Sequence, residues 1–200
     1  MIIHAQITKQ PLAGKYPEQI FEAPISVEDW TWVKFEDEDY SEFYGQFCGA
    51  PNSIAVSSKY ATCYVLTSNY LYEIDCNNPT NYTAHDFWDL GHTLRNFTVT
   101  PNGDPIFSDD YTIFTIEGTL SQQQEIHPPI ALDSIQFKHW DNQLLHISAE
   151  EFIIGKPVTL ILDANTMTIR FNKEKPPKTH DYNVLVVLFI NRTYLWDGSP

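Results

Sequence analysis

The residues best suited to chemistry or recognition lie in one short segment, Asp29–Gly49, which reads DWTWVKFEDEDYSEFYGQFCG. Carboxylates are packed densely inside this segment, and aromatic side chains stand on both sides of them. Such a surface suits a basic protein partner, because carboxylates pair with lysine and arginine while flat rings bury apolar area. We therefore take nine residues as the candidate partner-binding site: Trp30, Trp32, Glu36, Asp37, Glu38, Asp39, Tyr40, Glu42 and Tyr44.

The same carboxylates raise a calcium hypothesis, since hard cations bind several converging oxygens. An EF-hand loop needs Gly at its sixth position and Glu at its twelfth. Counted from Asp37, those positions are Glu42 and Cys48. No two histidines have the His-x-x-x-His spacing of a helical zinc site, and His139 and His146 are expected to form a cross-strand pair. We expect no metal and no cofactor.

Catalytic motifs are scarce. The sequence has no Gly-x-Ser-x-Gly elbow and no phosphate-binding glycine loop among its eight glycines. Acidic residues flanked by aromatics could serve a glycosidase, in which two carboxylates act on one sugar bond. Asp104, Asp109 and Asp110 are the acids considered, but all three occur in turns, where Asp ordinarily forms local hydrogen bonds. Enzymatic activity is therefore the alternative hypothesis.

The elements that must position the candidate site read as short strands. Residues 54–75, IAVSSKYATCYVLTSNYLYEID, are typical of three strands separated by polar turns. Residues 97–118, FTVTPNGDPIFSDDYTIFTIEG, repeat this order at an offset of about 42 residues, in the range of repeat units such as propeller blades. A weaker third copy starts at Ser134, with a turn at Asp141–Asn142.

The remaining chain completes an all-β prediction for a single domain. Residues 1–28 are expected to be irregular after an initial strand, because prolines interrupt them. Residues 29–155 form the acidic, repeat-like region, in which 76–95 is a loop with one helical turn and 148–154 a short capped helix. Residues 156–200 supply hairpins at 157–172 and 182–197. We predict a meander of propeller-blade-like units of three or four strands, with a β-sandwich or a single curved sheet as alternatives.

Charge and cysteine content limit the class of partner and the cellular compartment that we expect. The net charge is −14, and a strongly acidic protein repels nucleic acid and anionic membranes but attracts basic proteins. Cys48, Cys63 and Cys76 show no Cys-x-x-Cys spacing, so buried reduced thiols are expected. The first residues, MIIHAQITKQ, lack the features of an export signal. We expect a cytoplasmic protein that binds neither nucleic acid nor membrane.

The sequence shows two resemblances, one to a repeat architecture and one to a group of proteins. Trp-Asp occurs at residues 88–89, 140–141 and 196–197, and FINRTYLWD resembles the closing strands of a WD-type propeller blade, although the intervals of 52 and 56 residues exceed that family's period. More loosely, WVKFEDEDYSEFYGQFCG, IAVSSKYATCYVLTSNYLYEID and NFTVTPNGDPIFSDD resemble a group of uncharacterised bacterial cytoplasmic proteins, some of which accompany toxin systems. That resemblance implies a bacterial binding protein and supplies no catalytic residues.

Together these observations favour an acidic protein-binding module, an immunity or antitoxin-like inhibitor that caps a basic partner. A carbohydrate-active hydrolase or lectin-like module on a propeller-like scaffold is the first alternative. A structural or phage-associated protein is the second.

Overall fold

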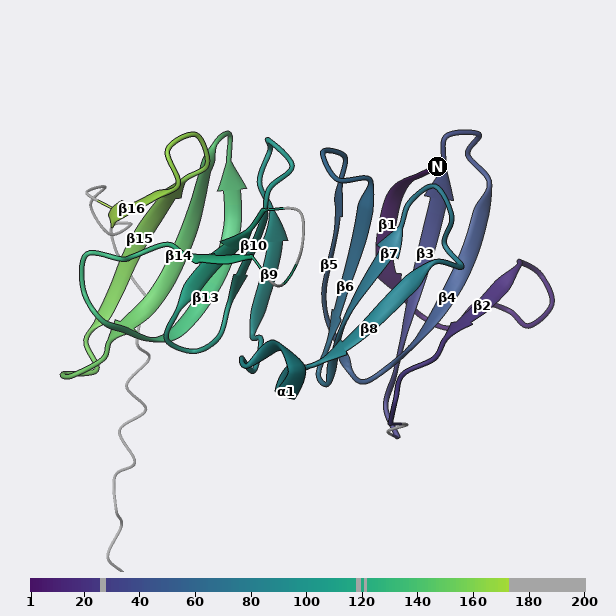
Figure 1. Ribbon diagram of the computed structural model, residues 1–200, viewed down its shortest axis with the longest axis horizontal. Coiled ribbons are helices and arrows are strands. Elements are labelled where there is room, and N and C mark those ends of the chain that lie inside the picture. The colour runs from purple at the N-terminus through teal and green to yellow at the C-terminus, as the bar shows by residue number, and fades with distance from the viewer. Residues whose placement is uncertain (26–27, 118–119, 121, 173–200) are drawn as a thin grey trace, which may run out of the picture.

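The protein folds almost entirely into β-strands, as seen in a computed structural model that describes residues 1–25, 28–117, 120 and 122–172 (Figure 1). The strands form four separate four-stranded sheets. The first contains β1 (Ile2–Thr8), β2 (Glu18–Phe21), β3 (Trp30–Asp37) and β4 (Glu42–Cys48), and the second β5 (Pro51–Ser57), β6 (Thr62–Thr67), β7 (Tyr70–Asp75) and β8 (Tyr82–Asp86). After α1 (Phe87–Leu90), the third contains β9 (Asn96–Val99), β10 (Pro105–Ser108), β11 (Ile113–Ile116) and β12 (Gln123–Glu125), and the fourth β13 (Leu132–Asp141), β14 (Leu144–Glu151), β15 (Pro157–Asp163) and β16 (Thr168–Phe171).

Three of the sheets are plain antiparallel meanders in which each strand pairs with the next in sequence. The first sheet differs. Its strand order is β1-β3-β4-β2, and β2 runs parallel to β4, with Phe21 opposite Phe47. The crossover from β1 to β2 and back to β3 leaves β3 and β4 in the middle of this sheet, so the candidate segment is held on both sides.

The sheets follow one another in chain order along the long axis, with the first and fourth at opposite ends (Figure 1). Neighbouring sheets contact each other through their first strands, β1 with β5, β5 with β9 and β9 with β13. A hydrophobic core fills each of the three junctions. The cores centre on Phe35 and Tyr72 for the first and second sheets, Leu66 and Phe107 for the second and third, and Ile113 and Leu160 for the third and fourth.

The all-β prediction is confirmed, and so are several of its parts. The segment 54–75 forms β5, β6 and β7, and its proposed copy forms β9, β10 and β11. The turn at Asp141–Asn142 joins β13 to β14, and a hairpin joins β15 to β16. Four separate sheets replace the alternatives of a sandwich or a single curved sheet. The predicted hairpin at 182–197 lies outside the described residues.

Other local predictions were wrong. Residues 148–154 are not a helix: Ser148 to Glu151 belong to β14, which pairs with β13 and β15 on its two sides. The stretch between Pro17 and Pro24 is not irregular, because β2 pairs there with β4. The loop expected at 76–95 contains the fourth strand of its sheet, β8, besides the single helical turn α1. Because β15 also pairs with β14, the boundary expected at residue 155 falls inside the fourth sheet.

Candidate partner-binding face

The β3–β4 hairpin places the candidate residues by strict alternation. Thr31, Val33 and Phe35 point inward and are buried, whereas Trp32, Lys34 and Glu36 point to the other side and remain partly exposed. This alternation is what a strand with one buried face dictates, since successive side chains project to opposite sides. The register then pairs Trp32 with Gln46, Lys34 with Tyr44 and Glu36 with Glu42.

Close packing on the inner side fixes the hairpin in place. Phe21, Phe35 and Phe47, from three different strands, are fully buried and converge over Gly45. A Cβ atom at Gly45 would lie 2.7 to 2.8 Å from all three rings. The rings of Phe21 and Phe47 stack with centroids 4.3 Å apart. This cluster anchors β2 to β4 and makes the opposite side of the sheet a rigid platform.

We call the opposite side the outer face of the first sheet. Strand pairing assigns eleven residues to it: His4, Gln6 and Thr8 from β1, Trp32, Lys34 and Glu36 from β3, Glu42, Tyr44 and Gln46 from β4, and Glu18 and Ile20 from β2. Four of the nine predicted site residues, Trp32, Glu36, Glu42 and Tyr44, are therefore brought together on one surface. They come from the two central strands of the sheet.

Three more predicted residues stand at the hairpin tip, past the end of the outer face. Glu38, Asp39 and Tyr40 are exposed in the turn between β3 and β4, and Tyr40 adopts a positive φ of 59°. The Glu38 carboxylate lies 3.3 Å from the N-terminal amine of Met1. The carboxylates of this tip are displayed to solvent, as a binding surface requires.

Asp37 has a structural role in the turn. One of its carboxylate oxygens accepts hydrogen bonds from the backbone N–H groups of Asp39 and Ser41, both at 2.9 Å. Such a bond from an Asp side chain to the following backbone is a standard turn device. Trp30 lies at the other end of β3 and is 39% exposed. The strand separates it from the tip by more than about 20 Å, so the nine residues do not form one compact patch.

Lys34 lies among the carboxylates of the outer face. Glu36 and Glu42 face each other across the strands, and the Lys34 amine lies 2.9 Å from a Glu42 carboxylate oxygen. Hydrogen bonding to Glu42 raises the pKa of Lys34 above its ordinary value, so the amine is charged at neutral pH. Beside it, Tyr16 packs on Tyr44 with ring centroids 4.9 Å apart.

The histidine pair and the cysteines considered for metal or redox chemistry are not among the residues of the outer face. Within the described ranges, no group of three or more His, Cys, Asp or Glu side chains could hold a metal ion. His139 and His146 form the predicted cross-strand pair, with rings stacked 4.6 Å apart. Cys48, Cys63 and Cys76 are buried thiols, as predicted.

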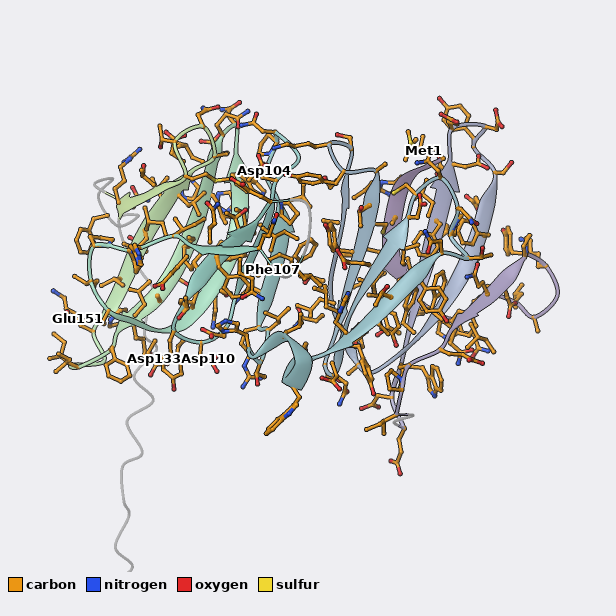
Figure 2. The ribbon with its side chains drawn as sticks, viewed as in Figure 1. Met1, Asp104, Phe107, Asp110, Asp133 and Glu151 are labelled. Carbon is orange, nitrogen blue, oxygen red and sulfur yellow. The ribbon has the colours of Figure 1, made fainter. Side chains whose placement is uncertain are left out.

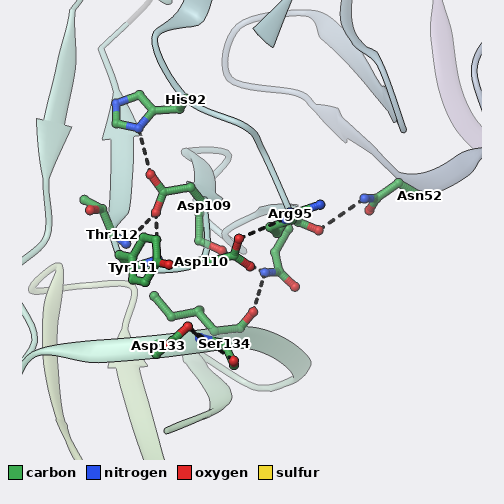
Figure 3. A network of polar contacts seen from close by, with 12 residues as sticks. Asn52, His92, Arg95, Asp109, Asp110, Tyr111, Thr112, Asp133 and Ser134 are labelled. Atoms are coloured by element: carbon green, nitrogen blue, oxygen red, sulfur yellow. Dashed lines mark hydrogen bonds and ion pairs between the residues drawn. The ribbon is translucent and has the colours of Figure 1, made fainter. Parts of the chain in front are cut away.

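The three aspartates of the hydrolase alternative do not converge on one site. Asp104 lies at one edge of the molecule and Asp110 at the other (Figure 2). Asp104 pairs with Lys59 beside a cavity of about 730 Å³ lined by turns and by strands β11 and β12. Asp109 and Asp110 belong to a separate polar network (Figure 3).

In that network each aspartate already has a partner. One Asp109 oxygen accepts the backbone N–H groups of Tyr111 and Thr112, and the other lies 2.8 Å from His92 Nδ1. Asp110 pairs with Arg95 at 3.1 Å. These bonds are local structural contacts, whereas a glycosidase places two carboxylates on either side of one sugar bond. Sequence reasoning missed His92 and Arg95, which lie 15 or more positions away from their partners in the chain.

Comparisons with known proteins give a fold likeness and no family. No protein-family model matches the sequence, and no curated protein sequence matches it. A solved structure described as the extracellular domain of a putative one-component system from B. thetaiotaomicron is similar, with a TM-score of 0.50 and 14% identity. The match covers 73% of this chain and 20% of that one. No helix within the described residues is long and apolar enough to span a membrane.

Proposed function

We propose that the protein is an acidic binding module that caps a basic partner protein, in the manner of an immunity protein or antitoxin. The observation that carries this proposal is the gathering of Glu36, Glu42 and Trp32 on one rigid face, with Glu38, Asp39 and Tyr40 at the tip next to it. Tyr44 lies on the same face but is buried against Tyr16, so it supports the face and offers a partner little area. Exposed carboxylates steer a basic partner during encounter, and aromatic side chains supply the contact area that holds it.

Charge supports the choice of a basic protein. The outer face and the tip carry five carboxylates, Glu18, Glu36, Glu38, Asp39 and Glu42, and the one lysine within the face, Lys34, is already paired with Glu42. Together with the net charge of −14, this excess repels phosphate groups. The partner surface therefore presents lysine or arginine, as the active site of an enzyme that acts on an anionic substrate does.

The scaffold of this proposal is a row of propeller-blade-like units. Each sheet has four strands, three of the four are simple meanders, and each packs on the next through its first strand. Cytoplasmic location is part of the same proposal. Three buried thiols suit a reducing compartment, in which disulfides do not persist.

The experiment is co-expression of the chain with the product of the neighbouring gene, followed by affinity purification. The double variant Glu38→Lys/Asp39→Lys reverses two exposed tip charges without touching Asp37, which shapes the turn. The matched control is Glu117→Lys/Asp141→Lys, which changes the net charge equally at exposed positions far along the chain from the first sheet. Loss of the complex in the first variant alone supports the proposal, and equal retention in both overturns the site.

A further inference from the structure

The turn between β14 and β15 exposes three large apolar side chains in succession. Phe152, Ile153 and Ile154 are 56%, 84% and 63% exposed. Isolated apolar residues on a surface are ordinary, but consecutive exposed ones in a turn are unfavourable unless they serve an interaction. We call these three residues the apolar turn.

Backbone hydrogen bonds fix the conformation of the apolar turn. Gly155 donates its N–H to the carbonyl of Glu151 at 2.8 Å, and Glu151 donates to the carbonyl of Lys156 at 2.9 Å. Gly155 has a φ of +62°, which closes the turn at low steric cost. Phe152 donates to the carbonyl of Ala131 at 3.1 Å. The side chains are thus presented on a fixed backbone, which lowers the entropic cost of binding.

An apolar cavity adjoins this turn. Its volume is about 410 Å³, and Tyr111, Pro128, Ile130 and Phe152 line it. Tyr111 stands edge-on to Phe152, with ring centroids 5.9 Å apart. The cavity can take one large apolar side chain, and the apolar turn can pack beside it.

The polar network of Figure 3 positions Tyr111 at this cavity. Asp109 binds the backbone N–H of Tyr111 at 2.8 Å and is itself in contact with His92. Asp109, one of the acids considered for a hydrolase, thus fixes the geometry of a surface turn. Tyr111 remains 54% exposed, so its ring is available to a partner.

Carboxylates surround the apolar surface. Glu150 and Glu151 precede the turn directly, Glu125 lines the cavity, and Asp133 follows Leu132 at the cavity wall. Asp110, Asp133 and Glu151 lie along the same lower edge of the molecule (Figure 2). Lys156 is the basic residue next to the turn, and His127 pairs with Glu125 at 3.1 Å. The border is therefore acidic on balance.

We propose that the apolar turn and its cavity bind a protein segment in which a large apolar side chain is flanked by lysine or arginine. The apolar side chain enters the cavity against Tyr111 and Phe152, and the basic residues meet the acidic border. The surface lies where the third and fourth sheets meet, in the half of the molecule opposite to the first sheet (Figure 1). It does not depend on the function proposed for that face.

The test uses two labelled peptides with the full chain. In one, Leu-Phe is flanked by two lysines on each side, and in the other by two glutamates. Fluorescence anisotropy is measured for the wild type and for Ile153→Ser/Ile154→Ser. The matched control, Leu12→Ser/Ile25→Ser, removes two side chains that are 75% and 67% exposed elsewhere. We expect the basic peptide to bind the wild type and the control, and to bind the turn variant at least about tenfold more weakly, a loss of about 1.4 kcal/mol.

Three results would overturn the proposal. The first is equal binding of the basic peptide to the turn variant and to the control. The second is that the wild type sediments with vesicles of phosphatidylcholine and phosphatidylglycerol, that the turn variant does not, and that neither protein binds the basic peptide. The third is a concentration-dependent dimer that only the turn variant loses, because a second copy would then be the occupant. Each readout is independent of the tip variants that test the first sheet.

Discussion

Glu36 and Glu42 lie directly opposite each other across the β3–β4 hairpin, and Lys34, one row away, binds Glu42 at 2.9 Å. Like charges facing each other across strands destabilise a sheet. Lys34 offsets part of this repulsion by pairing with Glu42, and the Glu36 carboxylate stays available to a partner. The outer face therefore keeps an excess of negative charge without losing its strand register.

Replacing Lys34 should leave the repulsion between Glu36 and Glu42 without compensation. We expect Lys34→Met to lower the melting temperature in low salt, and the decrease to shrink at about 0.5 M salt, where exposed charges are screened. The double variant Lys34→Met/Glu42→Gln should recover most of the loss. Because the folded pKa of Lys34 is raised, the pair stabilises at neutral pH, and its contribution disappears as the pH rises through the folded pKa. A decrease that is independent of salt would contradict this account.

Adding one carbon atom at Gly45 should strain the platform beneath the outer face. A Cβ there lies within 2.8 Å of three buried phenylalanine rings, so Gly45→Ala forces them apart. We expect a loss of about 1–3 kcal/mol in the free energy of unfolding, measured by urea denaturation. Gly45→Ala/Phe47→Leu should recover part of it. The neighbouring control Gln46→Ala points to the outer face and should change stability little; equal effects at both positions would refute the packing argument.

Acid should weaken the β7–β8 turn through Asp75. Its carboxylate accepts the backbone N–H of Asn77 at 2.8 Å and receives further bonds from Asn78 and Asn81, and these bonds lower its pKa. Since the folded pKa lies below the unfolded one, this stability is present above the unfolded value and is lost as the pH falls through the folded one. Asp75→Ala should therefore be less stable than the wild type at neutral pH. Urea denaturation should show the difference disappearing in strong acid, whereas a constant difference would exclude the charged carboxylate as its source.

The three thiols should be unreactive in the folded protein. Complete burial raises the pKa of Cys63, and burial raises that of Cys76 to about 11. At pH 8 a thiol with that pKa is about one part in a thousand thiolate, the form that reacts. Ellman's reagent should detect no fast-reacting thiol in the native state and three after denaturation. A native thiol that reacts within the mixing time would contradict the buried, reduced assignment.

Sequence patterns predicted the strands in which apolar and polar residues alternate or apolar residues are continuous. Burial of one face of a strand produces the first pattern, and burial of both faces produces the second. The patterns missed β8 and β12, whose residues YTAHD and QQE are half-buried or exposed and form strands by pairing with β7 and β11. The Ser-Ala-Glu-Glu pattern at 148–151 fits a helix cap locally, but pairing with two neighbouring strands determines its conformation. In the candidate site, Trp32 and Glu36 are separated by an even number of positions, so β3 places them on one face. The hairpin register, which separates Asp37 from that face, depends on β4 and could not be predicted from composition.

The last prediction concerns the junction of the third and fourth sheets, where the side chain of Asn96 hydrogen-bonds to the backbone of β13 as a neighbouring strand would. Its amide nitrogen donates to Ser108 Oγ and to the carbonyl of Ile135, both at 2.8 Å, and its oxygen accepts the N–H of Phe137 at 3.1 Å. The bonds to Ile135 and Phe137 fall beside an irregularity in the pairing of β13 with β14. Asn96 thus supplies a partner to backbone groups of β13 near the point where the regular ladder is interrupted.

Removing this amide should leave partly buried backbone groups unpaired. We expect Asn96→Ala to lower the free energy of unfolding, measured by urea denaturation, by about 1–3 kcal/mol. A donor or acceptor that is removed from water and has no partner is not compensated for its lost hydration. Asn96→Asp should be at least as unstable at neutral pH, since a carboxylate cannot donate and would face the carbonyl oxygen of Ile135. Its deficit should shrink in acid, where the protonated carboxyl regains one donor. Asn52→Ala, which removes an exposed amide bonded to the Arg95 carbonyl, should have little effect. If Asn52→Ala and Asn96→Ala were equally destabilising, Asn96 would have no special part in joining the two sheets.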